Sequence, residues 1–413
     1  MQGDERIAEH VLDNGVRVVA EHIPWVRSTA LGVYIRTGAA YEGASRHGLS
    51  HCIEHMLFKG TARRSAEQIA HVIDGVGGVL NAYTEHEYTC VYAQVVTDHA
   101  ELAVDIIADM LGESLFDDAE YQREKQVLIE EIKKADDTPD DRVHDLFAET
   151  IWPDHPLGQS VIGREEVVRA LARDAVVQFF RDNYGPGGIT FVVAGSLAPD
   201  AAFELARRYL GSLSGGSPPP LDASPRANSG EVYLTRPTEQ VHFCIGCEGL
   251  AMTDDDWHAL ALAECVLGGG MSSRLFQEIR EKRGLVYNIG SYLASYRCAG
   301  LLVVTGGATP ERWPMVRDLV REQVERTCEE GVSQAELDRA REQIKGGMAL
   351  ALENTGYRMR RIGTCILHFG RVIPVAEAIA RFEAVTTGRA TDAARRVLGA
   401  RPLHLAAVGP HGE

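Results

Sequence analysis

Residues 118–123 read Asp-Ala-Glu-Tyr-Gln-Arg and residues 334–339 read Gln-Ala-Glu-Leu-Asp-Arg, so one short pattern recurs in the two halves of the chain. Each copy begins a long segment with apolar residues at helical spacing, 118–134 in the first half and 333–352 in the second. A further helical segment precedes each copy. Matching helices in matching positions indicate an internal duplication.

The segments upstream of these helices also correspond between the halves. In each half a strand leads into a helix, and two further strands follow that helix. The expected strands lie at 16–20, 30–35, 77–83 and 89–96 in the first half and at 241–247, 287–293 and 301–306 in the second. Strands and helices grouped in blocks predict an α+β fold. We therefore expect two homologous α/β sandwich domains, each with helices packed on a largely antiparallel sheet.

A segment rich in glycine and proline separates the halves. It begins at Gly215 and Gly216, continues through three consecutive prolines, and ends at Gly230. This composition can neither propagate a helix nor pair as a central strand, so it predicts a linker. The expected division is a first domain over 1–214, a linker over 215–230 and a second domain over 231–413. Two domains also suit 413 residues, which exceed what one hydrophobic core usually supports.

Composition excludes several classes of partner. The formal net charge of -17 argues against a nucleic-acid surface, because phosphate binding needs a basic face. Residues 1–6 carry acids where a secretion signal would be basic, and no segment approaches the roughly 20 apolar residues of a membrane span. We therefore expect a cytoplasmic protein with neither a nucleic-acid nor a membrane partner. The eight scattered cysteines are expected to be reduced core residues. A redox or zinc role for Cys244 and Cys247 is disfavoured because the sequence has no second pair of closely spaced cysteines to complete such a site.

The first-half helix contains two histidines and a glutamate at metal-site spacing, His51, Glu54 and His55. Residues four apart stack on a helix, so both imidazoles can point at one ion while Glu54 borders the same face. Cys52 lies about 100° away around the helix, which favours a packing role for it. Aligning the halves places His51 near Leu260 and His55 near Glu264, so only the first half can assemble this site.

A catalytic zinc ion typically has three protein ligands, so two histidines leave one to be found. The segment 118–134 offers Glu124, Glu130 and Glu131. Glu124 and Glu131 are seven apart on one helix face, so if Glu131 binds the metal, Glu124 is near the same site. Glu130 is turned away and is expected to be solvated. Taken alone, these acids suit the polar side of a surface helix, but the histidine motif favours metal binding.

Such a site predicts hydrolysis of an amide bond. A bound zinc ion lowers the pKa of a water molecule, and Glu54 would take the proton and pass it to the leaving amine. The paired halves make a peptide a better substrate than another amide. Residues 268–273 are rich in glycine and serine but lack the ending of a phosphate loop, and we interpret them as a turn that ends a helix.

The His-x-x-Glu-His motif with its downstream glutamates resembles the inverted zinc motif of the pitrilysin or insulinase-like metallopeptidases, the inverzincins. The likeness extends over nearly the whole chain and includes segments 12–15, 81–84, 130–133, 137–141, 273–276 and Tyr287. It is closest to the short, single-unit branch with the bacterial processing-type peptidases and the catalytic subunit of the mitochondrial processing peptidase. The resemblance implies that His51, His55 and Glu131 bind one Zn²⁺ per chain. It also implies that Glu54 is the general base and that Glu124 supports the site.

The resemblance further implies how a peptide substrate is held. Asn81 and Ala82 would lie on an edge strand to which an extended peptide adds by main-chain hydrogen bonds. Arg280 and Tyr287 would reach the substrate from the second half and stabilise the polarised carbonyl. Without the family likeness, Tyr287 is equally a strand residue and Arg280 a surface charge. Family members of this length pair into a clamshell around an acidic chamber. We therefore expect a homodimer in which Arg280 and Tyr287 complete the site of the other subunit.

One alternative has the same fold without the activity. Core proteins of respiratory complexes share this architecture as catalytically silent structural subunits, and they typically lose motif residues. Here the expected ligands and the base are all present, which favours the zinc metalloendopeptidase.

Overall fold

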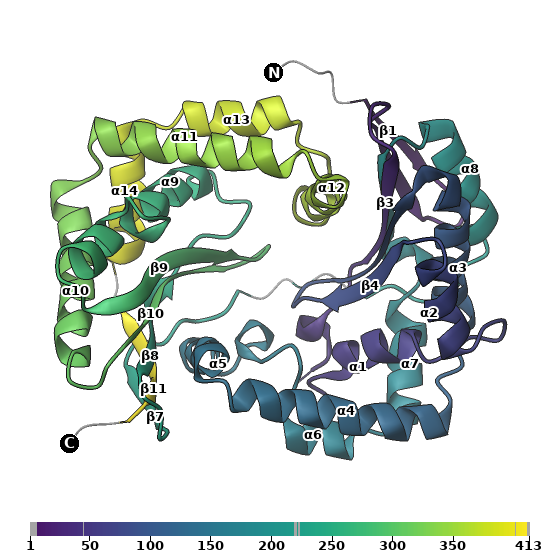
Figure 1. Cartoon of the computed structure of the whole chain (residues 1–413), viewed down its shortest axis with the longest axis horizontal. Helices are drawn as coiled ribbons and strands as arrows, with labels where there is room; N and C mark the ends of the chain where they lie inside the picture. The colour runs from purple at the N-terminus through teal and green to yellow at the C-terminus, as the bar shows by residue number, and fades with distance from the viewer. Residues whose placement is uncertain (1–5, 44, 219–220, 222–223, 401, 411–413) are drawn as a thin grey trace. The chain divides into compact units, whose positions relative to one another are not determined.

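The computed structural model describes residues 6–43, 45–218, 221, 224–400 and 402–410 (Figure 1). Residues 1–5 and positions 219, 220, 222 and 223 of the predicted linker lie outside the described residues. The chain forms two compact units, which are described one at a time below. Unit 1 comprises Met1–Ile132, Ser160–Leu221 and Ala349–Ile373, and unit 2 comprises Lys133–Gln159, Asp222–Met348 and Pro374–Glu413.

Unit 1 is built on a six-stranded sheet in the order β1-β2-β6-β3-β5-β4. Its neighbouring strands are antiparallel except for the parallel pair of β2 and β6. The strands are β1 Ile7–Val11, β2 Arg17–His22, β3 Ser28–Ile35, β4 Val79–Thr84, β5 Thr89–Val96 and β6 Ile189–Gly195. The helices are α1 Leu49–Leu57, α2 Ala66–Asp74, α3 Ala100–Glu113, α4 Asp118–Asp136, α6 Glu165–Ala170, α7 Arg173–Asn183, α8 Pro199–Leu210 and α12 Thr355–Phe369.

Unit 2 is built on a five-stranded sheet in the order β7-β11-β8-β10-β9, again with one parallel pair, β7 and β11. The strands are β7 Glu231–Thr235, β8 Val241–Glu248, β9 Val286–Ser295, β10 Gly300–Ala308 and β11 His404–Gly409. The helices are α5 Pro139–Ile151, α9 Trp257–Gly268, α10 Trp313–Glu330, α11 Gln334–Ala351, α13 Val375–Glu383 and α14 Thr387–Leu398.

Both units also contain short helical turns. Those of unit 1 are η1 Ala39–Tyr41, η2 Thr97–His99 and η4 Pro186–Gly188, and those of unit 2 are η3 Pro156–Gly158 and η5 Phe276–Glu281.

The two sheets have the same topology once β1 is set aside. In each sheet, the strand that comes first in the sequence pairs in parallel with the strand that comes last, β2 with β6 and β7 with β11. The remaining three strands are antiparallel and lie beyond that last strand. The helix between the central strand and the edge strand is α1 in unit 1 and α9 in unit 2. The predicted α+β duplication on largely antiparallel sheets is therefore confirmed.

The compact units exchange one helical segment relative to the two halves of the sequence. Helix α5 comes from the first half but packs on β8 and β11 of unit 2, and α12 comes from the second half but packs on β3 and β6 of unit 1. Figure 1 shows α12 on one side of the sheet of unit 1 and α3 and α8 on the other. Each sheet is thus covered on both faces, and the exchange is reciprocal.

The central strands of unit 1 are buried on both faces for this reason. Alternate residues such as Val18 and Leu31 pack with α1, α3, α7 and α8, whereas Val19 and Tyr34 pack with α12. Helix α12 begins after Asn354, whose side chain accepts a hydrogen bond from a first-turn amide, and it ends at a glycine in left-handed conformation.

Two expectations about composition can be compared with the fold. All eight cysteines are free, and five of them are buried, as expected for reduced core residues. Cys244 and Cys247 lie on β8. Across the described part of the chain, every helix is either too short or too polar to cross a bilayer.

Candidate metal centre

Two neighbouring helices of unit 1 bring three metal-binding side chains together. Helix α1 carries His51 and His55, whose rings lie 4.6 Å apart, and α4 carries Glu131. The Nε2 atoms of His51 and His55 lie 3.8 Å and 3.5 Å from the two carboxylate oxygens of Glu131. One ligand atom from each residue lies within 4.8 Å of the other two, and this is the one such group among the residues that the structure describes.

The donor set fits a zinc ion. Two imidazole nitrogens and one carboxylate oxygen are ligands that zinc accepts, and three protein ligands leave a position open for water. Burial, and secondarily the neighbouring His55, lowers the pKa of His51 to about 3. His51 is therefore neutral at physiological pH, as an imidazole must be to bind a metal.

Glu124 orients one of the histidines. Its Oε1 lies 2.9 Å from Nδ1 of His55, and its Oε2 lies 2.6 Å from Nζ of Lys59. Burial alone would raise the pKa of Glu124, but the hydrogen bonds from His55 and Lys59 outweigh it, so the pKa is lowered. An ionised Glu124 holds the proton of His55 on Nδ1, which leaves Nε2 with a lone pair facing His51 and Glu131.

Glu54 lies on the same helix but is not a member of the three-residue group. The Thr84 hydroxyl of β4 donates a hydrogen bond of 2.6 Å to its carboxylate. Burial raises the pKa of Glu54, opposed by this bond and by His55. A carboxylate with a raised pKa is a better proton acceptor near neutral pH, which is what a general base requires.

Asn81 and Ala82 lie on β4, at the edge of the sheet. This strand pairs with β5, and no other strand in the described residues lies beyond it. Asn81 is exposed, and Ala82 is buried on the face toward α1. The free edge of β4 can accept another strand, and the substrate role of Asn81 and Ala82 stays a prediction.

Arg280 and Tyr287 lie in unit 2, whereas the histidine pair lies in unit 1. The Arg280 guanidinium is 4.5 Å from the ring centroid of Phe276 and 5.6 Å from that of Tyr287. Tyr287, at the start of β9, is 82 % exposed. Arg280 is half-buried beside these two rings, and the contact of Arg280 and Tyr287 with substrate remains a prediction.

Lys59, Thr84 and Glu42 were not predicted. Glu42 is buried, and its carboxylate accepts hydrogen bonds from the amides of Gly48 and Ser50 at the start of α1. Lys59 follows His55 by four residues, so helical spacing could have identified it. Thr84 lies on β4, which only the tertiary fold brings to α1, whereas Glu42 lies shortly before α1 in the sequence but has no helical spacing to it.

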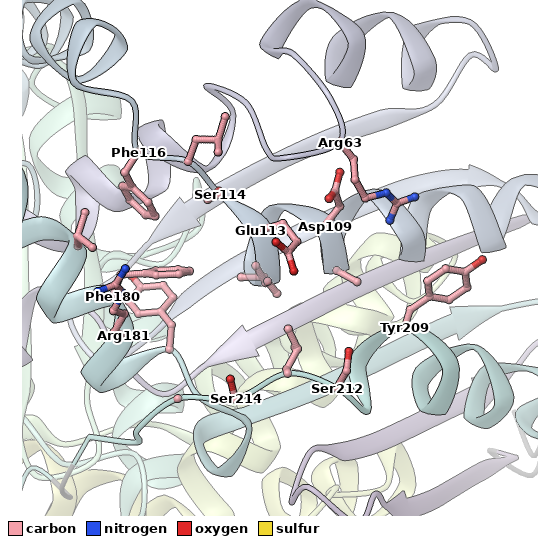
Figure 2. Close-up of a pocket in the computed structure, with 18 of the residues that line it drawn as sticks. Arg63, Asp109, Glu113, Ser114, Phe116, Phe180, Arg181, Tyr209, Ser212 and Ser214 are labelled. Carbon is pink, nitrogen blue, oxygen red and sulfur yellow. The ribbon is translucent and has the colours of Figure 1, made fainter.

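A cavity of about 690 Å³ lies elsewhere in unit 1, between α3, α7, α8 and the segment that follows α8 (Figure 2). None of the predicted site residues lines it. Arg63 and Arg181 line it together with Asp109 and Glu113, so its charge does not select one class of ligand. Four separate chain segments form its walls, so no local sequence pattern predicts this cavity.

Comparison with known proteins agrees with this arrangement. Residues 17–165 match the family model described as Insulinase (Peptidase family M16), and residues 170–344 match the model described as Peptidase M16 inactive domain. The histidine pair and Glu131 fall within the first match, and Arg280 and Tyr287 within the second.

Curated relatives cover almost the whole chain. The uncharacterized zinc protease YmxG of Bacillus subtilis is 37% identical over 98% of this chain and 99% of its own. An uncharacterized zinc protease of Streptomyces coelicolor is 40% identical over 97% of this chain and 88% of its own.

Solved structures share the fold at low sequence identity. A structure described as a peptidase M16 inactive domain, from Pseudomonas fluorescens, has a TM-score of 0.93 at 18% identity and covers 98% of both chains. A protease from Helicobacter pylori has a TM-score of 0.92 at 19% identity, covering 98% of this chain and 100% of its own. With the fold, the family models and the relatives in agreement, the chain belongs to peptidase family M16, the insulinase family.

Proposed function

We propose that the chain is a zinc-dependent metalloendopeptidase that hydrolyses peptide bonds in extended peptides or presequences. The observation that carries this proposal is the convergence of His51, His55 and Glu131 from two helices, with Glu54 beside them. The zinc proteases among its relatives support the same conclusion.

In this proposal each residue of unit 1 has one task. His51, His55 and Glu131 hold one zinc ion, which when bound supplies Lewis-acid chemistry to a water molecule and a carbonyl. Glu124 fixes the tautomer of His55 through Nδ1. Glu54 accepts the proton of the attacking water at its carboxylate and delivers it to the leaving amine. Thr84 holds that carboxylate in place.

The substrate side of the proposal rests on the free edge of β4 and on the family resemblance. An extended peptide would add to β4 at Asn81 and Ala82 by main-chain hydrogen bonds. Arg280 and Tyr287 would stabilise the polarised carbonyl. The resemblance also favours a homodimer that encloses the peptide in a chamber, with Arg280 and Tyr287 supplied by the other subunit.

Cleavage of a peptide library, followed by mass spectrometry, tests the proposal. Wild type and Glu54→Gln are each loaded with zinc, and their metal content is measured. We expect equal zinc content and a loss of cleavage of at least about 100-fold in the variant, the size typical for a general base. Cuts that persist in Glu54→Gln would remove Glu54 from this role.

A second pair of variants separates the metal site from the surface of α4. Glu131→Gln should lose zinc, whereas Glu130→Gln, which alters the exposed neighbouring residue, should keep it. A wild-type protein with one zinc per chain that cleaves no peptide, even as a dimer, would instead identify a catalytically silent structural subunit.

A further inference from the structure

Glu42 is a fully buried carboxylate that contacts the helix of the metal centre without contacting the metal-binding residues. It follows η1, and its side chain is 0% exposed. Its Oε2 accepts a hydrogen bond of 2.7 Å from the amide of Gly48, and its Oε1 accepts one from the amide of Ser50. His51 is the next residue along α1. One carboxylate therefore binds the amide of the N-cap residue and the amide of the second residue of the helix that carries the ligands.

The start of α1 cannot be capped by its own residue. The N-cap residue is Gly48, with φ of 91°, and it has no side chain to accept a first-turn amide. A Cβ at Gly48 would lie 2.8 Å from the carbonyl oxygen of Ile162 and 3.1 Å from Cα of Gly163. A serine or aspartate cap is thus excluded by both backbone conformation and space. Glu42 provides from a distance the acceptors that such a cap would provide.

The charge of Glu42 also bears on metal binding. The amino end of a helix carries a partial positive charge of about +0.5, and His51 lies in this first turn. A divalent cation bound there is repelled by the helix end. A carboxylate against the first-turn amides offsets that repulsion and fixes the direction in which the turn presents His51.

We propose that Glu42 is a positioning residue for the metal centre: it holds the first turn of α1 and offsets its positive end, so that His51 and His55 bind zinc. This inference rests on the proposed zinc function. Burying a carboxylate that has no cationic partner is costly even when amides donate hydrogen bonds to it, so stability alone is a poor reason to bury this group. Burial raises the pKa of Glu42 to about 7, and the hydrogen bonds from the amides of Ser50 and Gly48 oppose the rise.

The test measures zinc affinity, by competition with a chromogenic chelator on the full-length metal-free protein. Glu42→Gln keeps the shape but removes the charge and one acceptor. The matched control is Glu264→Gln on α9, the counterpart of α1 in unit 2, where burial likewise raises the pKa of the carboxyl to about 7. We expect Glu42→Gln to weaken zinc binding roughly tenfold, as loss of a group behind the ligands typically does, and Glu264→Gln to leave it unchanged.

Thermal unfolding of the metal-free variants shows whether each is folded. If Glu42→Gln does not fold, Glu42→Asp takes its place: it keeps the charge but is one methylene too short to reach both amides, and we expect it to bind zinc several-fold more weakly than wild type. Unchanged zinc affinity in the folded Glu42 variant, or an equal loss in Glu264→Gln, would overturn the inference. A wild type that binds no zinc would refute the proposed function instead, so the two failures are distinguishable.

Discussion

Glu264 occupies the place in the second half that His55 occupies in the first. Its Oε1 accepts a hydrogen bond of 2.6 Å from the Ser291 hydroxyl of β9. Burial raises the pKa of Glu264 from 4.5 to about 7, opposed by that bond. Helix α9 thus carries a sheltered carboxyl group instead of a histidine at this place. A carboxyl in such surroundings makes folding stability depend on pH.

Replacing Glu264 by glutamine should flatten that dependence. Between pH 4.5 and about 7 the unfolded chain has released the proton that the folded chain still holds, so this group's contribution to the free energy of unfolding falls as pH rises and levels off above about 7. Glutamine does not titrate and still accepts from Ser291. We compare the free energy of unfolding of Glu264→Gln with that of wild type at each pH. The difference should therefore favour the variant more at about pH 8 than at about pH 4.5.

Urea unfolding at both pH values measures this difference. The exposed residue Glu281 provides the control, and Glu281→Gln should change stability equally at both. A difference between Glu264→Gln and wild type that stays the same across the pH range would contradict the assignment.

The residues of the metal group were predictable because each relation is local to one helix. His51 and His55 are four apart, and Glu124 and Glu131 are seven apart, so sequence spacing alone places each pair on one face. That α1 and α4 face each other came from the family likeness and not from spacing. Thr84 and Glu42 escaped prediction because a hydroxyl on a strand and a carboxylate after a short turn carry no periodic signal.

At the scale of elements, the exchange of α5 and α12 was not visible in the sequence. An amphipathic pattern shows that a helix buries one face, but not which sheet receives that face. In α12 the buried side chains Met359, Ile362 and Ile366 meet the sheet of unit 1, more than 150 residues away along the chain. The boundaries at 214 and 231 stay a prediction about the duplicated halves, whereas the compact units also depend on these long-range contacts.

Gly363 makes the packing of α12 testable. An added Cβ there would lie 2.4 Å from the ring of Tyr34, a fully buried side chain of β3. Gly363→Ala should therefore lower the free energy of unfolding by about 1–3 kcal/mol through overpacking, and urea denaturation should show an earlier midpoint.

A second glycine provides the matched control for this substitution. Gly347 lies inside α11, and an added Cβ there meets nothing within 4 Å. Gly347→Ala should instead stabilise the protein by about 0.5–1 kcal/mol, because alanine is the better helix former. Equal midpoints for the two variants would show that α12 does not pack as described.

At the scale of the whole molecule, the duplication has separated two sets of groups that one reaction would need. The metal group and Glu54 belong to unit 1, whereas Arg280 and Tyr287 belong to unit 2. The sequence could assign each set to its half, because the motifs are local. Which subunit completes which site depends on assembly, and assembly leaves no periodic trace in a sequence.

Mixing two inactive variants tests completion across subunits. Glu54→Gln removes the proposed general base and Arg280→Ala removes the arginine proposed to stabilise the carbonyl, so each variant alone should be poorly active. If Arg280 acts on the site of the other subunit, a heterodimer has one complete site, formed by Glu54 of one chain and Arg280 of the other. Random pairing makes half of the dimers mixed, so an equal mixture should regain about a quarter of wild-type peptide cleavage. If Arg280 acts on the site of its own chain, no site in any dimer is complete and the mixture regains no peptide cleavage.

The mixing experiment needs a control variant that alters the same surface but leaves Arg280 in place. Arg283 lies three residues from Arg280 and pairs with Glu278. Arg283→Ala should be active alone, and mixing it with Glu54→Gln should only dilute that activity. The mixture is informative only if the subunits exchange between dimers. Size-exclusion chromatography with one tagged variant measures this exchange directly. Exchange without any regained cleavage would place Arg280 beside the metal group of its own chain, or outside the reaction altogether.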